Sequence, residues 1–126
     1  MVTTDVAQLS RECNAWRETL RSYRDEFGQL KSRLQEVAAR QSHKETLQEV
    51  EHLDNQFHIQ LINIHDLKQS IKSHDRRMSN ERIIYNGQID DNSLTDHEHL
   101  YDDYQHLEHH LQDLRKEFAD FISRTR

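Results

Sequence analysis

Residues 6–37 read VAQLSRECNAWRETLRSYRDEFGQLKSRLQEV, and this stretch decides the fold. Its larger apolar residues are separated by three and four positions in strict alternation: Val6, Leu9, Cys13, Trp16, Leu20, Tyr23, Phe27, Leu30, Leu34 and Val37. Every a and d position of a heptad repeat is therefore filled, and the only other apolar residues are alanines. A seam this narrow is typical of a coiled coil. We predict a helix over about residues 4–40.

Two further stretches carry the same kind of repeat. In the second, over about residues 43–86, apolar residues spaced by seven form the central line: Val50, Phe57, Ile64, Ile71, Met78 and Tyr85. In the third, over about residues 94–125, the heptad positions are His97, Leu100, Tyr104, Leu107, Leu111, Leu114, Phe118, Phe121 and Thr125. Ser42 with Glu45, and Ser93 with Asp96, have the spacing of capping boxes and mark the two starts. The sequence predicts one all-α domain over residues 1–126, in which three long antiparallel helices form a coiled-coil-like three-helix bundle (up-down-up).

The composition excludes several other classes of protein. The chain has no proline and only two glycines, so it lacks the residues that make the tight turns of sandwiches, barrels and Rossmann-type sheets. Its net charge is −6 and no segment is strongly basic, so we expect no nucleic acid as a partner. No stretch of about 18 apolar residues is present, so we expect no membrane partner. The start lacks the pattern of a secretory signal and Cys13 is the single cysteine, so we expect a cytoplasmic protein.

Histidine is the unusual residue of this chain, with ten copies. In the third predicted helix, His99, Asp103, His106 and His110 are spaced by four, three and four, so they form one row. If the second and third helices pack antiparallel about a turn near residue 90, His74 comes level with about residue 107. His74, Asp103, His106 and His110 would then form a four-ligand set for zinc or another divalent transition metal.

A solvated helix flank explains the same row of histidines, and we prefer that explanation because no H-E-x-x-H or CxxC motif is present. We therefore expect no cofactor. Cys13 belongs to the first seam and is expected to pack in the core. His97 occupies a heptad core position, and we expect it to be held by a polar partner or water rather than to act as a ligand. The chain has no glycine-rich phosphate loop and no recognisable nucleophile and base, so we expect that it is not an enzyme.

Two features point to protein contact. In a parallel pair of identical first helices, Glu12 would face Arg17 and Glu26 would face Lys31, although the same charges can equally border the other two helices within one chain. Ile59 and Ile62 lie one turn apart on the back face of the second helix, where they indicate an interface. We expect a non-enzymatic oligomerisation or adaptor module that forms a homodimer or higher oligomer. The alternative is a metal-binding or metal-sensing bundle that uses the histidines of the third helix.

Overall fold

The computed structural model describes residues 5–84 and 89–125, and these residues form three α-helices with no strand among them. The helices are α1 (Val6–Ala38), α2 (Lys44–Ile84) and α3 (Asp91–Thr125), with 33, 41 and 35 residues. At about 1.5 Å per residue they are roughly 50, 60 and 50 Å long. The predicted all-α bundle of three long helices is confirmed. Tyr85 and the predicted end of the second helix at Asn86 lie outside the described residues.

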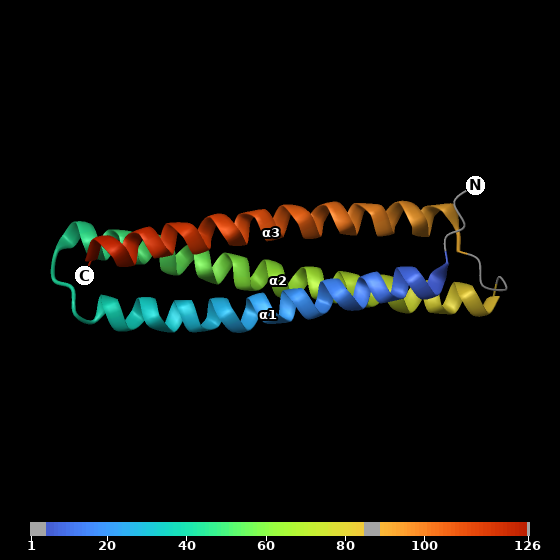
Figure 1. The fold of residues 1–126 in the computed structure, drawn as a ribbon, viewed down its shortest axis with the longest axis horizontal. Coiled ribbons are helices and arrows are strands. Elements are labelled where there is room, and N and C mark those ends of the chain that lie inside the picture. The colour runs from blue at the N-terminus through green and yellow to red at the C-terminus, as the bar shows by residue number, and fades with distance from the viewer. Residues whose placement is uncertain (1–4, 85–88, 126) are drawn as a thin grey trace.

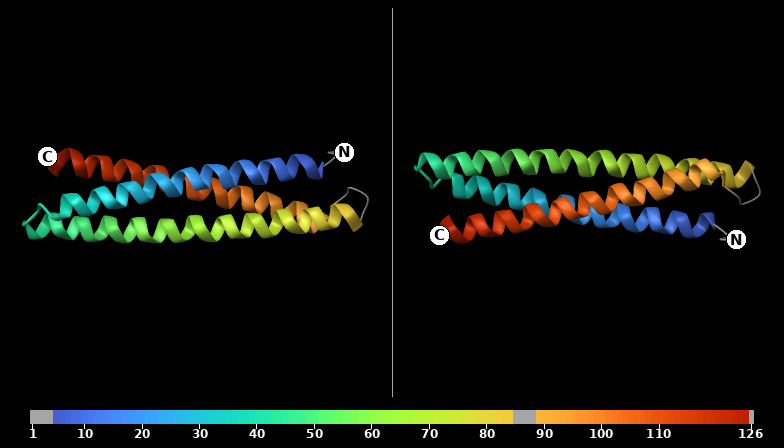
Figure 2. Two further views of the ribbon diagram at one scale, coloured as in Figure 1. Left: turned by 90° about the horizontal axis from the view of Figure 1, so that it is seen from below. Right: turned by 90° about the horizontal axis from the view of Figure 1, so that it is seen from above.

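The three helices run along one axis, and α2 packs against both α1 and α3 (Figure 1). α1 and α3 run in the same direction and α2 runs in the opposite direction, so the start of α1 and the start of α3 are at the same end. The two further views show nearly straight helices that cross one another at shallow angles (Figure 2). The predicted up-down-up order is confirmed. Residues of α1 and α3 with similar distances from their helix starts therefore lie at the same level.

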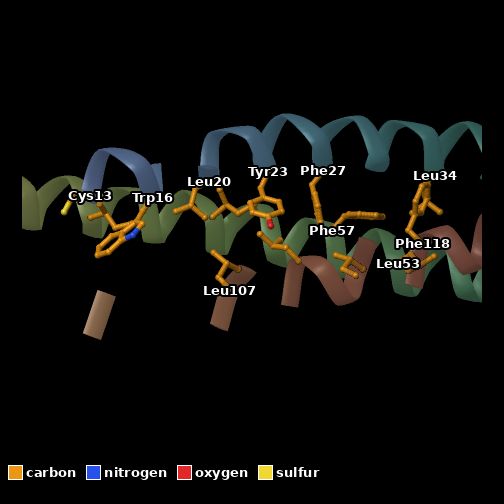
Figure 3. Packing of buried hydrophobic residues seen from close by; sticks show 14 of the residues in the cluster. Cys13, Trp16, Leu20, Tyr23, Phe27, Leu34, Leu53, Phe57, Leu107 and Phe118 are labelled. Atoms are coloured by element: carbon orange, nitrogen blue, oxygen red, sulfur yellow. The ribbon is translucent and has the colours of Figure 1, made fainter. Parts of the chain in front are cut away.

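Aromatic rings from all three helices meet in the middle of the core (Figure 3). Phe57 of α2 packs edge-on against Phe27 of α1 and Phe118 of α3, with ring centroids 5.8 and 5.5 Å apart. Phe27 and Phe57 are fully buried, as are Leu20 and Leu34 of the first seam. The seam that the alternation of three and four predicts is therefore the contact surface of α1 within the chain.

The charged residues beside the first seam bind α2 and α3 of the same chain. Glu26 accepts two hydrogen bonds from Arg115 of α3, at 2.6 and 2.7 Å. Lys31 lies 3.6 Å from a carboxylate oxygen of Asp54 in α2. Of the two arrangements that the sequence allows for these charges, the structure has the one within a single chain. The apolar seam of α1 is buried or half-buried against the other two helices.

The start of α3 and its register against α2 differ from the prediction. α3 begins at Asp91 rather than at about residue 94, and Asp90 caps it by accepting a hydrogen bond from the Asn92 amide at 3.2 Å. Ser93, the predicted cap, instead donates to Glu81 of α2 at 2.6 Å. His74 is level with His97 rather than with residue 107, which corrects the predicted level.

Candidate functional site

A polar cluster interrupts the apolar core at the end of the bundle where α2 is joined to α3. Each helix contributes one side chain: Cys13 from α1, His74 from α2 and His97 from α3, which are 0%, 3% and 4% exposed. All three stand in the core pattern of their helices, since His74 lies three residues after the buried Ile71 and four before the buried Met78. The heptad repeat that folds the bundle therefore also gathers these three side chains.

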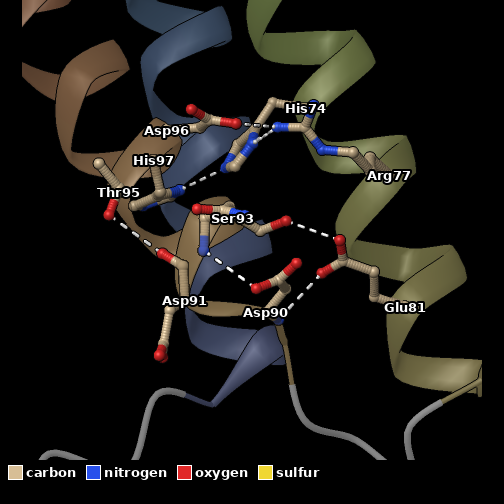
Figure 4. A network of polar contacts seen from close by, with 10 residues as sticks. His74, Arg77, Glu81, Asp90, Asp91, Ser93, Thr95, Asp96 and His97 are labelled. Atoms are coloured by element: carbon tan, nitrogen blue, oxygen red, sulfur yellow. Dashed lines mark hydrogen bonds and ion pairs between the residues drawn. The ribbon is translucent and has the colours of Figure 1, made fainter.

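The two histidines belong to a chain of hydrogen bonds that crosses the bundle, and Figure 4 shows its part from Arg77 to His97. The Arg77 guanidinium donates to Nδ1 of His74 at 3.2 Å, and Nε2 of His74 lies 3.0 Å from Nδ1 of His97. Nε2 of His97 lies 2.9 Å from a carboxylate oxygen of Glu12. A guanidinium can only donate, so Nδ1 of His74 must accept. His74 then carries its proton on Nε2 and donates it to His97, and His97 donates its own Nε2 proton to Glu12.

The surroundings keep His74 and Cys13 uncharged near neutral pH. Burial, together with the nearby His97 and Arg77, lowers the pKa of His74 to about 4. Burial, together with the negative charge of Asp75, raises the pKa of the Cys13 thiol to about 12. One carboxylate oxygen of Asp75 is itself buried without a hydrogen-bond partner among the described residues. The cluster therefore offers nitrogen and sulfur donor atoms, with a carboxylate oxygen nearby that accepts no hydrogen bond from the described residues.

The cluster has the composition and spacing of a metal site. One ligand atom from each of Cys13, His74 and His97 can be chosen so that the three atoms lie within 4.8 Å of one another. The sulfur of Cys13 lies 3.9 Å from Nδ1 of His97. Within residues 5–84 and 89–125, no other group of three histidine, cysteine or acidic side chains is gathered in this way. The arrangement can hold one small cation that prefers nitrogen and sulfur ligands.

The four-ligand set predicted from the sequence is not brought together. Asp103, His106 and His110 line a shallow groove against Asp66 of α2. His74 instead lines a separate groove between α2 and α3, together with His99 of the predicted row. The reason is the register of α3 against α2, which brings His97 rather than Asp103 or His106 to the level of His74. Whether the row itself binds a metal stays a prediction.

Two residues of the observed cluster were expected in the core without a chemical role. Cys13 is buried as expected, and His97 has the polar partners that its core position predicted. The sequence does hold a signal that could have predicted that Cys13 and His97 lie close together. Both occupy core positions of the heptad repeat near the starts of α1 and α3, and in an up-down-up bundle these starts lie at the same end.

The isoleucines predicted as an interface lie away from this cluster on the middle of α2. Ile59 and Ile62 are 43% and 47% exposed. None of the three described helices combines the length and the apolar content that crossing a membrane requires. Comparisons of the chain with protein-family models, with curated proteins and with solved structures found no match.

Proposed function

We propose that this chain is a non-enzymatic helical bundle that works through protein contact, with a second copy of itself as the partner. The observation that carries the proposal is the stretch NQFHIQLINIH at residues 55–65, in the middle of α2. It contains no Asp, Glu, Lys or Arg, whereas these residues make up 32% of the whole chain. Depletion of charge distinguishes the centre of protein interfaces from the remaining surface.

The side chains of this stretch divide between the core and the outside. Phe57 and Ile64 are fully buried, while Ile59 and Ile62 are exposed to nearly half. Their exposed neighbours are neutral polar residues and histidines: Asn55, His58, Asn63 and His65. The outer face of α2 therefore combines two large apolar side chains with groups that can form hydrogen bonds. We call Ile59, Ile62 and these four neighbours the neutral face.

A second copy of the chain fits the neutral face better than a charged partner does. Two copies that meet through a two-fold axis place the same patch on both sides of the contact, so a charged patch would repel itself. The neutral face avoids this repulsion. If the two α2 helices cross antiparallel near Ile59 and Ile62, uncharged side chains lie opposite one another. The acidic Asp54 and Asp66, which border the stretch, then lie outside the centre of the contact.

The test compares the oligomeric state of the native chain with that of two double variants. Static light scattering and sedimentation equilibrium over a wide range of micromolar concentrations should show a dimer for the native chain. Ile59→Lys with Ile62→Lys should give a monomer of about 15.2 kDa with unchanged circular dichroism. The control is Ile83→Lys with Ile84→Lys, because these isoleucines are more exposed, at 80% and 68%, but lie outside the neutral face. The control should remain a dimer.

A native chain that is monomeric at every concentration would contradict the proposal, as would a control pair that dissociates as readily as the Ile59 and Ile62 pair. The second candidate function is metal binding. The observation that favours it is the group of Cys13, His74 and His97, not the row of histidines on α3.

A further inference from the structure

We infer that Cys13, His74 and His97 form a binding site for one zinc ion or a chemically similar divalent transition metal. Each helix of the bundle supplies one ligand, so a bound ion joins all three. One thiolate and two imidazoles are a ligand set that zinc prefers, whereas magnesium and calcium prefer oxygen ligands. The site is independent of the neutral face, and either proposal can fail without the other.

The distances between the ligand atoms suit a tetrahedral ion. Zinc lies about 2.3 Å from sulfur and about 2.0–2.1 Å from nitrogen, so the sulfur–nitrogen and nitrogen–nitrogen edges of its tetrahedron are about 3.6 and 3.4 Å. The sulfur of Cys13 lies 3.9 Å from Nδ1 of His97, and this atom lies 3.0 Å from Nε2 of His74. These two edges are within a few tenths of an ångström of the required length. The three ligand atoms lie within 4.8 Å of one another, so Cys13 and His74 have to approach each other when an ion binds.

His97 is already oriented as a ligand. Its Nδ1 faces both other ligand atoms, while its Nε2 donates a hydrogen bond to Glu12 at 2.9 Å. A carboxylate on the second nitrogen fixes the tautomer and ring direction of metal-binding histidines. The indole of Trp16 packs 4.8 Å from the His97 ring and restricts its rotation. His97 can therefore bind the ion without any change in its own protonation.

His74 has to change its tautomer. Its Nε2 carries a proton in the metal-free chain, and this proton has to move to Nδ1 when Nε2 binds the ion. Nδ1 then meets the Arg77 guanidinium, which is also a donor, so Arg77 has to turn away. Arg77 is half-exposed and already donates to Asp96 at 2.8 Å, so this carboxylate can hold it after the turn. Arg77 is thus a positioning residue that favours the metal-free state.

The proton balance of binding follows from these assignments. His74 and His97 each keep one proton, and the Cys13 thiol loses its proton to become the thiolate ligand. One proton is therefore released for each ion bound. The ion and the thiolate leave one positive charge in the site, near the carboxylates of Asp75 and Glu12 and the guanidinium of Arg17, whose charges act on Cys13. Binding should weaken as the pH falls, because protons compete for the thiolate.

The first test is metal titration of the full chain with a thiol-free reductant. Zinc, measured in competition with a chromophoric chelator, should bind one ion per chain, raise the melting temperature and release one proton. Cobalt should give tetrahedral d–d bands and a thiolate charge-transfer band. Cys13→Ser should abolish the charge-transfer band and weaken binding by more than about a hundredfold, the upper range for loss of an outer-shell partner. The absence of binding at defined stoichiometry would overturn the inference.

The matched control is the pair His106→Ala with His110→Ala, on the exposed row of α3. This variant should keep the stoichiometry, the affinity and the cobalt spectrum. If it loses them while Cys13→Ser keeps them, the exposed row is the metal site and the buried cluster is not. Circular dichroism of each metal-free variant shows whether it has folded.

The second test uses Arg77 and does not depend on the folding of a core variant. Arg77→Gln removes the donor that opposes the new Nδ1 proton of His74, and should tighten zinc binding by up to about tenfold. Arg76→Gln, at the adjacent exposed position, should leave the affinity unchanged. Nitrogen NMR of the native chain should show the His74 proton moving from Nε2 to Nδ1 on addition of zinc, while His97 keeps its proton on Nε2. A zinc-saturated chain whose His74 tautomer is unchanged would overturn the inference.

Discussion

The stability of the bundle depends on the protonation of one buried side chain, that of His74. Its folded-state pKa is about 4, well below the ordinary value of 6.5, because the ring is buried beside His97 and Arg77. Between these two values the unfolded chain binds a proton that the folded chain does not bind. The free energy of unfolding therefore decreases as the pH falls from about 6.5 to 4. At about 1.4 kcal/mol per pKa unit, the loss from His74 amounts to about 3 kcal/mol.

Urea titrations at several pH values, with a chelator present, measure this loss. The native chain should become less stable over the window from pH 6.5 to 4, and His74→Gln should show a shallower slope over the same window. His99→Gln changes an exposed histidine of the same groove and should keep the native slope. Equal slopes for the native chain and His74→Gln would show that His74 is not the group that titrates.

The residue scale is also where the sequence stops predicting the site. That Cys13 and His97 lie in the core follows from heptad positions, which are local. That they lie near His74 depends on the register of α2 against α3, which the heptad pattern of neither helix specifies. Ser93 was predicted to cap α3 because of its spacing to Asp96, but its hydroxyl donates a hydrogen bond to Glu81 of α2 instead. A hydrogen bond of this kind has no signature in the sequence around either residue.

At the scale of single elements, one substitution in α1 should increase the stability of the bundle. Gly28 lies in the interior of this helix, and a Cβ atom added there would meet nothing within 4 Å. Glycine in a helix interior is less favourable than alanine by about 1 kcal/mol, since its backbone loses more freedom on folding. Gly28→Ala should therefore raise the free energy of unfolding by about that amount.

Chemical unfolding monitored by circular dichroism gives the change in stability. Ser32→Ala is the matched control, because this residue is exposed one turn further along the same helix and already has a Cβ. Its gain should be smaller than that of Gly28→Ala. A loss of stability in Gly28→Ala would mean that the outer side of α1 is covered by another surface, such as a second copy.

The helices themselves were the most predictable elements, because their signal is local and repeats many times. Eight of the ten seam positions of residues 6–37 are buried in the core as the heptad pattern predicts, and the other two, Leu30 and Val37, are partly buried against it. Helix ends were less predictable, since one cap competes with several alternatives. The exposed Ile59 and Ile62 were also found from periodicity, because they fall on the side of α2 opposite the buried Phe57 and Ile64.

At the scale of the whole molecule, the two halves of the bundle are stabilised differently. The middle is held by Phe27, Phe57 and Phe118, one ring from each helix. At the end with the polar cluster, α3 offers only partly buried apolar side chains between His97 and Leu107. Folding therefore removes less apolar surface from water at this end than in the middle. The hydrogen bonds that replace an apolar core layer contribute little net stability.

This difference predicts that the bundle opens first at the cluster end. Without metal, amide hydrogen exchange should be faster in residues 71–84 and 91–104 than in residues 50–64 and 111–121, because local opening needs less free energy where fewer apolar contacts are lost. Mass spectrometry of peptides from the two halves of α2 and α3 gives the comparison within the same helices. Zinc should slow exchange mainly at the cluster end, since its three ligands tie that end together. Equal protection along all three helices in the chelated chain would show instead that the bundle unfolds as one unit, with the hydrogen bonds of the polar layer holding it as firmly as the aromatic rings hold the middle.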